Sequence, residues 1–164
     1  MARPGDHPDF FRLPPPPGRS RESTIRLDAL GHFIHDGTMV EHPGMARAFA
    51  SWIARHPDDG RFILSNGYDW TYFEVEDAPF FVDTVKSVSE RPWLVLFDGS
   101  EEPLDPATLT LHPSGALSTR VKQGAFDARF RANAQLGLAP WLEEDAGGAP
   151  CLVISGVRYP LPPC

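Results

Sequence analysis

The sequence contains little cysteine and no recognisable metal-binding spacing. Only two cysteines occur among 164 residues, Cys151 and Cys164, and no Cys-x-x-Cys pair or cysteine–histidine cluster accompanies them. A structural zinc site therefore has no support from the sequence. Cys151 opens an apolar stretch, so we expect a small buried residue there. So few cysteines are typical of a reducing compartment, and we expect a cytoplasmic protein.

Long apolar runs are also missing. No segment approaches the roughly 20 consecutive apolar residues that a membrane-spanning helix needs. The N-terminal residues lack the apolar core of a secretory signal. The formal net charge is −7, and an acidic chain is repelled by phosphate backbones and by anionic lipid surfaces. We therefore expect no nucleic-acid partner and no membrane partner.

Several common catalytic signatures do not occur either. The sequence contains neither Gly-x-Gly-x-x-Gly nor Gly-x-x-x-x-Gly-Lys, which excludes the familiar phosphate-binding loops. Gly-x-Ser-x-Gly is missing too, and Ser155-Gly156 falls in a predicted hairpin instead of a strand-to-helix turn. We expect no cofactor, and the sequence weighs against an enzyme.

Proline and glycine are abundant, with 18 and 14 residues, which indicates many turns and short elements. The spacing of Met45, Phe49 and Trp52 predicts one helix between residues 43 and 56. Turn dipeptides such as Asp36-Gly37 separate short segments in which apolar and polar residues alternate. Strands are predicted in this first half over residues 25–28, 32–35, 38–40, 62–64, 70–75 and 80–88.

The second half repeats this arrangement. After Gly124, the apolar residues Phe126, Phe130 and Ala134 recur every four positions, which predicts one helix. Strands are predicted over residues 93–97, 108–111, 116–121, 151–154 and 157–161. Short antiparallel strands with one helix in each half are typical of an α+β protein made of two small, β-rich, roll-like halves.

Three segments follow from these patterns. Residues 1–23 contain six prolines and dispersed arginines but few apolar residues, so we expect a disordered tail. Residues 24–90 are predicted to form an N-terminal β-rich roll with one helix. Residues 91–164 are predicted to form a C-terminal α+β roll with one helix.

A set of short phrases resembles one bacterial family, the domain of unknown function 1285 (DUF1285). They are Gly31-His32-Phe33-Ile34-His35-Asp36-Gly37, Val75-Glu76-Asp77-Ala78-Pro79-Phe80, Val121-Lys122-Gln123-Gly124, Ala128-Arg129-Phe130 and Ser155-Gly156-Val157-Arg158-Tyr159. The resemblance covers about residues 24–161 in pattern order, and this chain is a divergent example. It implies two β-rich, roll-like halves with a helix each. It implies no established substrate, cofactor or catalytic residue.

Histidines near the first hairpin suggest a metal hypothesis. His32, His35 and His42 lie within eleven residues, with Asp36 nearby, but zinc needs three or four ligands that converge on one point. On a strand, His32 and His35 face opposite sides. We therefore predict no metal site and keep His35 and Asp36 as candidate binding residues.

Acidic residues gather in the most specific family phrase. Glu74 and Glu76 share a strand face, about 7 Å apart. Such a pair can divide acid and base roles if burial separates the two pKa values. The simpler interpretation is a solvated acidic edge, with Asp77 fixing the turn before Pro79. Glu76 and Asp77 remain candidate site residues.

Aromatic residues supply the other candidates. Trp70 and Tyr72 lie on a predicted strand, and a half-open roll lined with aromatic rings can bind an apolar ligand or an extended peptide. The alternative is that both rings belong to the core. Arg129, on the second predicted helix, is a candidate for binding an anion or for pairing with the acidic residues.

Three functional hypotheses follow. The first is a soluble, non-enzymatic protein that binds a small molecule or a protein partner. The second is a hydrolase, metal-assisted or acid/base, that uses His35, Asp36, Glu76 and Asp77, which must then converge in one cleft. The third is a structural homodimer joined through exposed strand edges.

Overall fold

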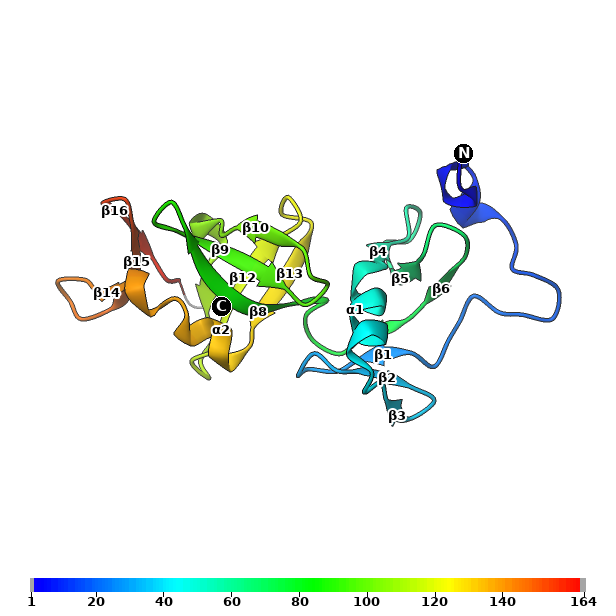
Figure 1. Ribbon diagram of the computed structural model, residues 1–164, viewed down its shortest axis with the longest axis horizontal. Helices are drawn as coiled ribbons and strands as arrows, with labels where there is room; N and C mark the ends of the chain where they lie inside the picture. The colour runs from blue at the N-terminus through cyan, green and yellow to red at the C-terminus, as the bar shows by residue number, and fades with distance from the viewer. Residues whose placement is uncertain (1, 163–164) are drawn as a thin grey trace. The chain divides into compact units, whose positions relative to one another are not determined.

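The computed structural model describes residues 2–162, and the chain divides into two compact units after Asp77. Unit 1 comprises residues 2–77 and unit 2 residues 78–162 of the described chain (Figure 1). The sequence predicts a boundary between residues 90 and 91 instead. The difference comes from strand β8 (Phe80–Val88), which pairs with two strands of unit 2. Cys164 lies outside the described residues.

Unit 1 contains two small sheets and one α-helix. One sheet has the order β3-β2-β1-β7 and the other the order β4-β5-β6. All their neighbouring strands are antiparallel except the parallel pair β1 and β7. The elements are β1 (Arg26–Leu27), β2 (Phe33–His35), β3 (Thr38–Met39), α1 (Pro43–Ser51), β4 (Ile53–Arg55), β5 (Phe62–Ser65), β6 (Trp70–Tyr72) and β7 (Glu74–Val75).

Local sequence explains how the first elements begin and end. The β2–β3 turn places Asp36 and Gly37 at φ values of 51° and 77°, the left-handed geometry that a tight hairpin requires. His42 caps α1, because its Nδ1 accepts the backbone N–H of Met45 at 3.2 Å. The helix is shorter than the sequence predicts, since Ile53 already belongs to β4.

The core of unit 1 joins α1 to the first sheet through aromatic rings. Phe33 of β2 is buried and contacts the ring of Phe49 edge-on, with centroids 5.5 Å apart. Phe33 also packs near Phe73, whose backbone N–H bonds to Phe62 of the second sheet. The two sheets of unit 1 therefore share one apolar interior.

The N-terminal residues, which the sequence predicts to be a disordered tail, contact unit 1 in the structure. They form two short 3-10 turns, η1 (Pro4–Asp6) and η2 (Phe10–Arg12), and Phe10 is buried. The backbone N–H of Gly5 donates to Gly67 at 2.7 Å. Low apolar content alone did not reveal these contacts, because two adjacent phenylalanines carry most of the burial.

Unit 2 is built on a six-stranded sheet with the order β10-β9-β8-β13-β12-β11 (Figure 1). In this sheet, the neighbouring strands β8 and β13 are parallel. The other sheet of unit 2 has three strands in the order β14-β15-β16. The elements are β8, β9 (Arg91–Leu96), β10 (Glu101–Pro103), β11 (Thr110–Leu111), β12 (Leu117–Val121), β13 (Phe126–Phe130), α2 (Ala132–Leu136), β14 (Leu142–Glu144), β15 (Pro150–Ile154) and β16 (Val157–Pro160), with 3-10 turns at Pro106–Thr108 and Ala139–Trp141.

Strand β13 corrects the predicted second helix. Residues 126–130 are a strand at the centre of the large sheet, and the α-helix begins only at Ala132. A spacing of four residues is compatible with both periods, because residues i and i+4 share a face on a strand as well as on a helix. Residues 126–130 form a strand because they pair in parallel with β8, which lies far away in the sequence.

The α+β class predicted from the sequence is confirmed, with mostly antiparallel strands and one short α-helix in each unit. Cys151 is buried in β15, as expected. Among residues 2–162, no helix is long and apolar enough to cross a bilayer.

Candidate functional site

A cavity of unit 2 opens between its two sheets and has a volume of about 630 Å³. Its apolar walls come from β11, β12, β14, the start of β15 and the C-terminal segment. The residues are Leu111, Leu117, Leu142, Pro150 and Leu161. Two of the contributing strands, β11 and β14, lie at the edges of their sheets. We call this cavity the unit 2 groove.

One amide side chain fixes a wall of the unit 2 groove. Gln135 of α2 lines the cavity, and its Oε1 accepts the backbone N–H of Leu117 at 3.0 Å. Its Nε2 donates to the carbonyl of Gly115 at 2.7 Å. Helix α2 is thereby tied to the end of β12, so the groove has a wall held by hydrogen bonds.

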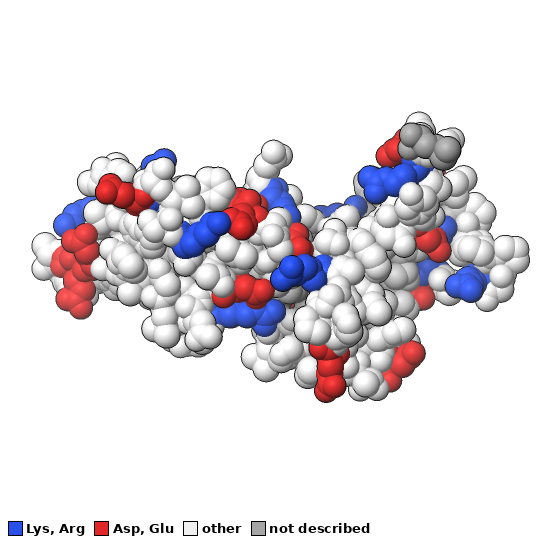
Figure 2. All heavy atoms as spheres, viewed as in Figure 1, with Lys and Arg blue, Asp and Glu red and all other residues white. Residues whose placement is uncertain are grey.

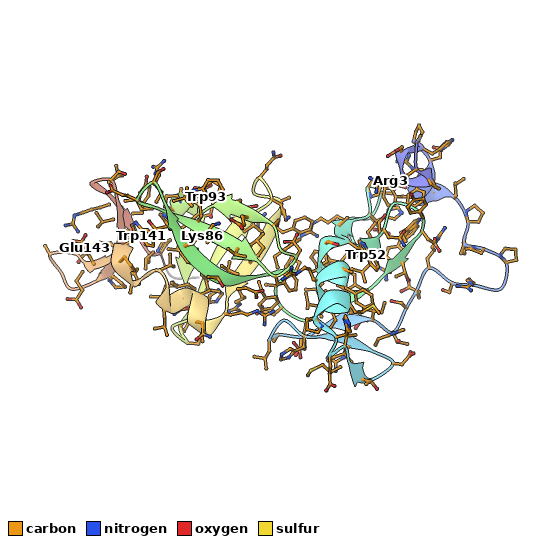
Figure 3. All side chains as sticks on the ribbon, viewed as in Figure 1. Arg3, Trp52, Lys86, Trp93, Trp141 and Glu143 are labelled. Carbon is orange, nitrogen blue, oxygen red and sulfur yellow. The ribbon has the colours of Figure 1, made fainter. Side chains whose placement is uncertain are left out.

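Carboxylates stand at the rim. Glu143 and Glu144 of β14 line the groove and are exposed. Figure 2 shows acidic atoms gathered over the β14 end of unit 2, and Figure 3 shows Glu143 at the same end. A guanidinium nitrogen of Arg158 lies 3.8 Å from Glu143, which leaves Glu144 as the rim carboxylate outside this ion pair.

The shape and lining of the groove determine what it can hold. Small-molecule sites are concave, mostly apolar and about 300–1,000 Å³ in volume, with a few polar groups that orient the ligand. The unit 2 groove has that volume and that lining. Its rim offers the carboxylate acceptors of Glu143 and Glu144.

The predicted aromatic residues Trp70 and Tyr72 lie in unit 1, on β6. Trp70 is buried and Tyr72 partly buried. Their ring centroids are 5.1 Å apart, and each packs on His56, at 5.1 Å and 5.7 Å respectively. His56 is itself buried. The prediction of an aromatic surface thus corresponds to a compact cluster.

Charged groups surround that cluster. The guanidinium of Arg61 lies 3.7 Å above the Tyr72 ring and forms an ion pair with Glu22. The Tyr72 hydroxyl donates to Asp59 at 2.7 Å. This hydrogen bond lowers the pKa of Asp59 and raises the pKa of Tyr72. The hydrogen bond stabilises the ionised carboxylate of Asp59. A lowered pKa makes this carboxylate a weaker base, so the pairing does not prepare Asp59 for general-base catalysis at neutral pH.

His35 and Asp36 lie together at the first hairpin. His35 Nε2 is 3.5 Å from Asp36, and both side chains are exposed. Asp36 also accepts the hydroxyl hydrogen of Thr24 at 2.5 Å. These contacts fix the turn between β2 and β3.

Glu76 lies at the opposite end of the same sheet. In register, His35 lies level with residue 25, whereas Glu76 lies level with residue 28. Three residues separate these levels, so they are about 10 Å apart along the strands, and β1 lies between them. Glu76 accepts the backbone N–H of Ala29 at 3.3 Å and is 3.6 Å from Arg26. The structure does not bring His35 and Glu76 together.

The remaining candidates are Asp77 and Arg129. Asp77 ends unit 1, and Arg129 lies on β13, opposite Ser118 and Phe81 in the sheet. Within residues 2–162, no group of three or more histidine, cysteine, aspartate or glutamate side chains could hold a metal ion. Of the residues predicted for acid/base or metal-assisted hydrolysis, His35 therefore lies beside Asp36 but apart from Glu76.

The unit 2 groove is not predicted from the sequence. Its walls are leucines and a proline, which look like ordinary core residues until the tertiary structure leaves one side of them open. Strand β14 was not predicted either, because Pro140 indicated only the end of the second helix or a new turn. The one sequence feature that points to the groove and its rim is Leu142 followed directly by two glutamates.

The chain is thus a two-unit α+β protein with an open cavity in unit 2. Two solved DUF1285 family proteins have the same fold. The chain aligns with one from Silicibacter pomeroyi DSS-3 at a TM-score of 0.66 and 23% identity, covering 94% of this chain and 86% of that one. It aligns with one from Shewanella baltica OS155 at a TM-score of 0.57 and 18% identity, covering 74% of this chain and 94% of that one.

The resemblance to DUF1285 that the sequence phrases suggested is thus confirmed in the fold. No protein-family model matches the chain, and no curated protein matches it. The descriptions of both solved proteins give the family and no activity.

Proposed function

We propose that this chain is a non-enzymatic binding protein whose unit 2 groove holds a small apolar molecule with a positively charged or N–H-donating end. The volume and apolar lining of the groove are the observations that support this proposal. The apolar body of the ligand lies against the leucines, and its charged end lies at Glu144. Burial of the apolar body supplies most of the affinity, and the carboxylate supplies the preference for charge.

The hydrolase hypothesis has less support. It requires His35, Asp36, Glu76 and Asp77 in one cleft, and the sheet register separates His35 from Glu76. The homodimer hypothesis stays a prediction. Its support is that β11 and β14 are edge strands in their own sheets, where a second copy would pair. We therefore place ligand binding first.

The proposal is tested with two probes of equal chain length, octylamine and octanoate, in isothermal titration of the whole chain. Octylamine is expected to bind at least about tenfold more tightly than octanoate, because the rim carboxylates attract one end group and repel the other. Glu144→Gln is expected to reduce this preference. Equal binding of both probes, or binding of neither, contradicts the proposal.

A matched pair of variants separates groove binding from general stickiness. Leu142→Trp places a bulky ring in the unit 2 groove and is expected to weaken octylamine binding by about tenfold or more. Leu136→Trp adds the same ring on α2 at a side chain that is 73% exposed and does not line the groove. It is expected to leave binding unchanged. If both variants behave alike, the groove is not the site.

A further inference from the structure

The N-terminal arm of unit 1, residues 4–12, covers a surface that has the features of a peptide-binding site. We call this surface the aromatic face. It lies on β5, β6 and the end of β4, and it consists of His56, Ile63, Trp70 and Tyr72. The arm contributes no strand to any sheet; it forms only the turns η1 and η2. It therefore contacts the aromatic face chiefly through side chains.

Two adjacent phenylalanines of the arm anchor it. Phe10 is 5% exposed and packs in one buried cluster with Ile63 and Trp70. The ring of Phe11 meets Trp70 and His56, each with a centroid distance of 6.0 Å. Buried aromatic anchors of this kind dominate the binding energy of protein interfaces.

A polar latch follows the two anchors. Arg12 forms a two-pronged ion pair with Asp58, with Nε–Oδ2 at 3.0 Å and Nη2–Oδ1 at 2.7 Å. His56 Nδ1 accepts the backbone N–H of Asp58 at 3.1 Å, so its proton lies on Nε2, which donates to the Phe11 carbonyl at 2.9 Å. The face thus recognises two phenylalanines, one backbone carbonyl and one arginine in consecutive positions.

The connection between the arm and the rest of unit 1 allows release. Residues 13–20 contain Pro14–Pro17 and are exposed, apart from the partly buried Pro15. A proline-rich segment is extended at about 3.1 Å per residue and acts as a semi-rigid spacer. The chain rejoins the body at Arg21, whose carbonyl accepts the backbone N–H of Tyr72 at 2.7 Å. The arm can therefore leave the aromatic face while residue 21 stays in place.

The arm does not satisfy every polar group beneath it. Trp70 is 6% exposed, and its Nε1 is buried without a hydrogen-bond partner in the described chain. A buried donor without an acceptor lowers the affinity of whatever covers it. A peptide that supplied an acceptor to Trp70 would bind the same face more tightly than the arm does.

We propose that the aromatic face of unit 1 is a peptide-binding site for protein segments with two adjacent aromatic residues followed by arginine, and that the arm occupies this site in cis. The partner is a protein with such a segment in an extended, exposed stretch. Its binding requires the arm to leave first, so the apparent affinity of the partner depends on how firmly the arm is held.

The test uses the intact chain and a fluorescent synthetic peptide of residues 3–13. The wild-type protein is expected to bind it weakly, because the arm competes. Arg12→Ala in the protein removes the latch from the arm and leaves the aromatic face unchanged, so it is expected to bind the wild-type peptide about tenfold more tightly. Arg19→Ala, in the exposed connection, is the matched control and is expected to bind like the wild-type protein.

Peptide variants check the chemistry on the same proteins. The Phe10→Ala peptide is expected to bind the Arg12→Ala protein at least about thirtyfold more weakly than the wild-type peptide, since it lacks the buried anchor. A shuffled peptide is expected not to bind. The proposal is overturned if Arg12→Ala fails to tighten binding, or if the Phe10→Ala or shuffled peptide binds like the wild-type peptide.

A second measurement covers the case in which a variant disturbs the fold. A protease site inserted between Pro15 and Pro16 lets the arm be cut from the correctly folded protein. Native mass spectrometry is then expected to show loss of the arm fragment on dilution and its replacement by the added peptide. A fragment that never exchanges, or a cut protein that unfolds once the fragment leaves, shows that the arm is simply part of the core. Arm exchange into dimers supports the same site with a second copy as its source.

Discussion

Lys122 shows how a residue from a family phrase can have a structural task. Its Nζ donates to Asp98 at 2.9 Å and to Ser100 at 2.8 Å, and its backbone N–H donates to Glu102 at 3.1 Å. Its φ of 54° is left-handed. Lys122 therefore holds the β12–β13 turn against the loop before β10.

Asp98 predicts a measurable dependence of stability on pH. Burial alone would raise its pKa, but hydrogen bonds from Ser100 and Lys122 outweigh burial, so the pKa lies below its ordinary value. The unfolded chain then binds a proton more readily than the folded chain. The stabilisation is complete above an unfolded pKa of about 3.9 and is lost as the pH falls through the folded value.

Asp98→Asn removes this titration. We expect the free energy of unfolding to fall less between pH 5 and pH 2.5 in Asp98→Asn than in the wild-type protein, as measured by urea denaturation at each pH. The variant is also expected to be less stable at pH 6, because it loses the charge of a partly buried ion pair. Parallel pH profiles for the two proteins would contradict this account of Asp98.

Among the elements, the N-terminal arm depends on one close backbone approach. A Cβ at Gly5 would lie 2.9 Å from the carbonyl oxygen of Gly67 and 3.0 Å from its Cα. Both atoms belong to the backbone and cannot rotate away. Gly5 is therefore required for the hydrogen bond that holds η1 against the β5–β6 turn.

Gly5→Ala is expected to detach the first turn of the arm. Hydrogen exchange measured by mass spectrometry should speed up in residues 4–12, and the protein should lose about 1–3 kcal/mol of stability. Gly147→Ala is the control, since its nearest contact would be a side-chain oxygen of Asp145 at 3.4 Å. Unchanged exchange in the arm of Gly5→Ala would show that the contact with Gly67 is not needed.

The elements also show what a sequence can reveal. Strand β8 was predicted with its observed bounds, because six of its nine residues are β-branched or aromatic. Strands β4, β10 and β14 were missed, because each has only three residues, too few to show a periodic apolar pattern. Strand β13 was read as a helix because its apolar spacing suits both.

The candidate site was predictable only in part. Trp70 and Tyr72 were candidates for a binding surface, with the core as the alternative, and the structure places both in an aromatic cluster beneath an arm expected to be disordered. Their role in binding stays a prediction. The unit 2 groove could not be foreseen, since leucine patterns do not show which side chains the fold leaves uncovered. The separation of His35 and Glu76 followed only from the sheet register.

For the whole molecule, the division into two units makes the location of binding testable. Every residue that lines the unit 2 groove lies between residues 111 and 161. We therefore expect a fragment of residues 78–164 to fold, as judged by circular dichroism, and to bind octylamine with the affinity of the whole chain. A fragment of residues 1–77 is the control and should not bind it. A folded 78–164 fragment without affinity would show that the groove is insufficient.

The most direct test of the central claim is a titration of the ¹⁵N-labelled whole chain with octylamine, followed by amide chemical shifts. The proposed function predicts saturable shifts concentrated on β11, β12 and β14 and near Leu161, with unit 1 unaffected. Shifts confined to unit 1, spread evenly over the surface, or missing at saturating octylamine would contradict a ligand site in the unit 2 groove.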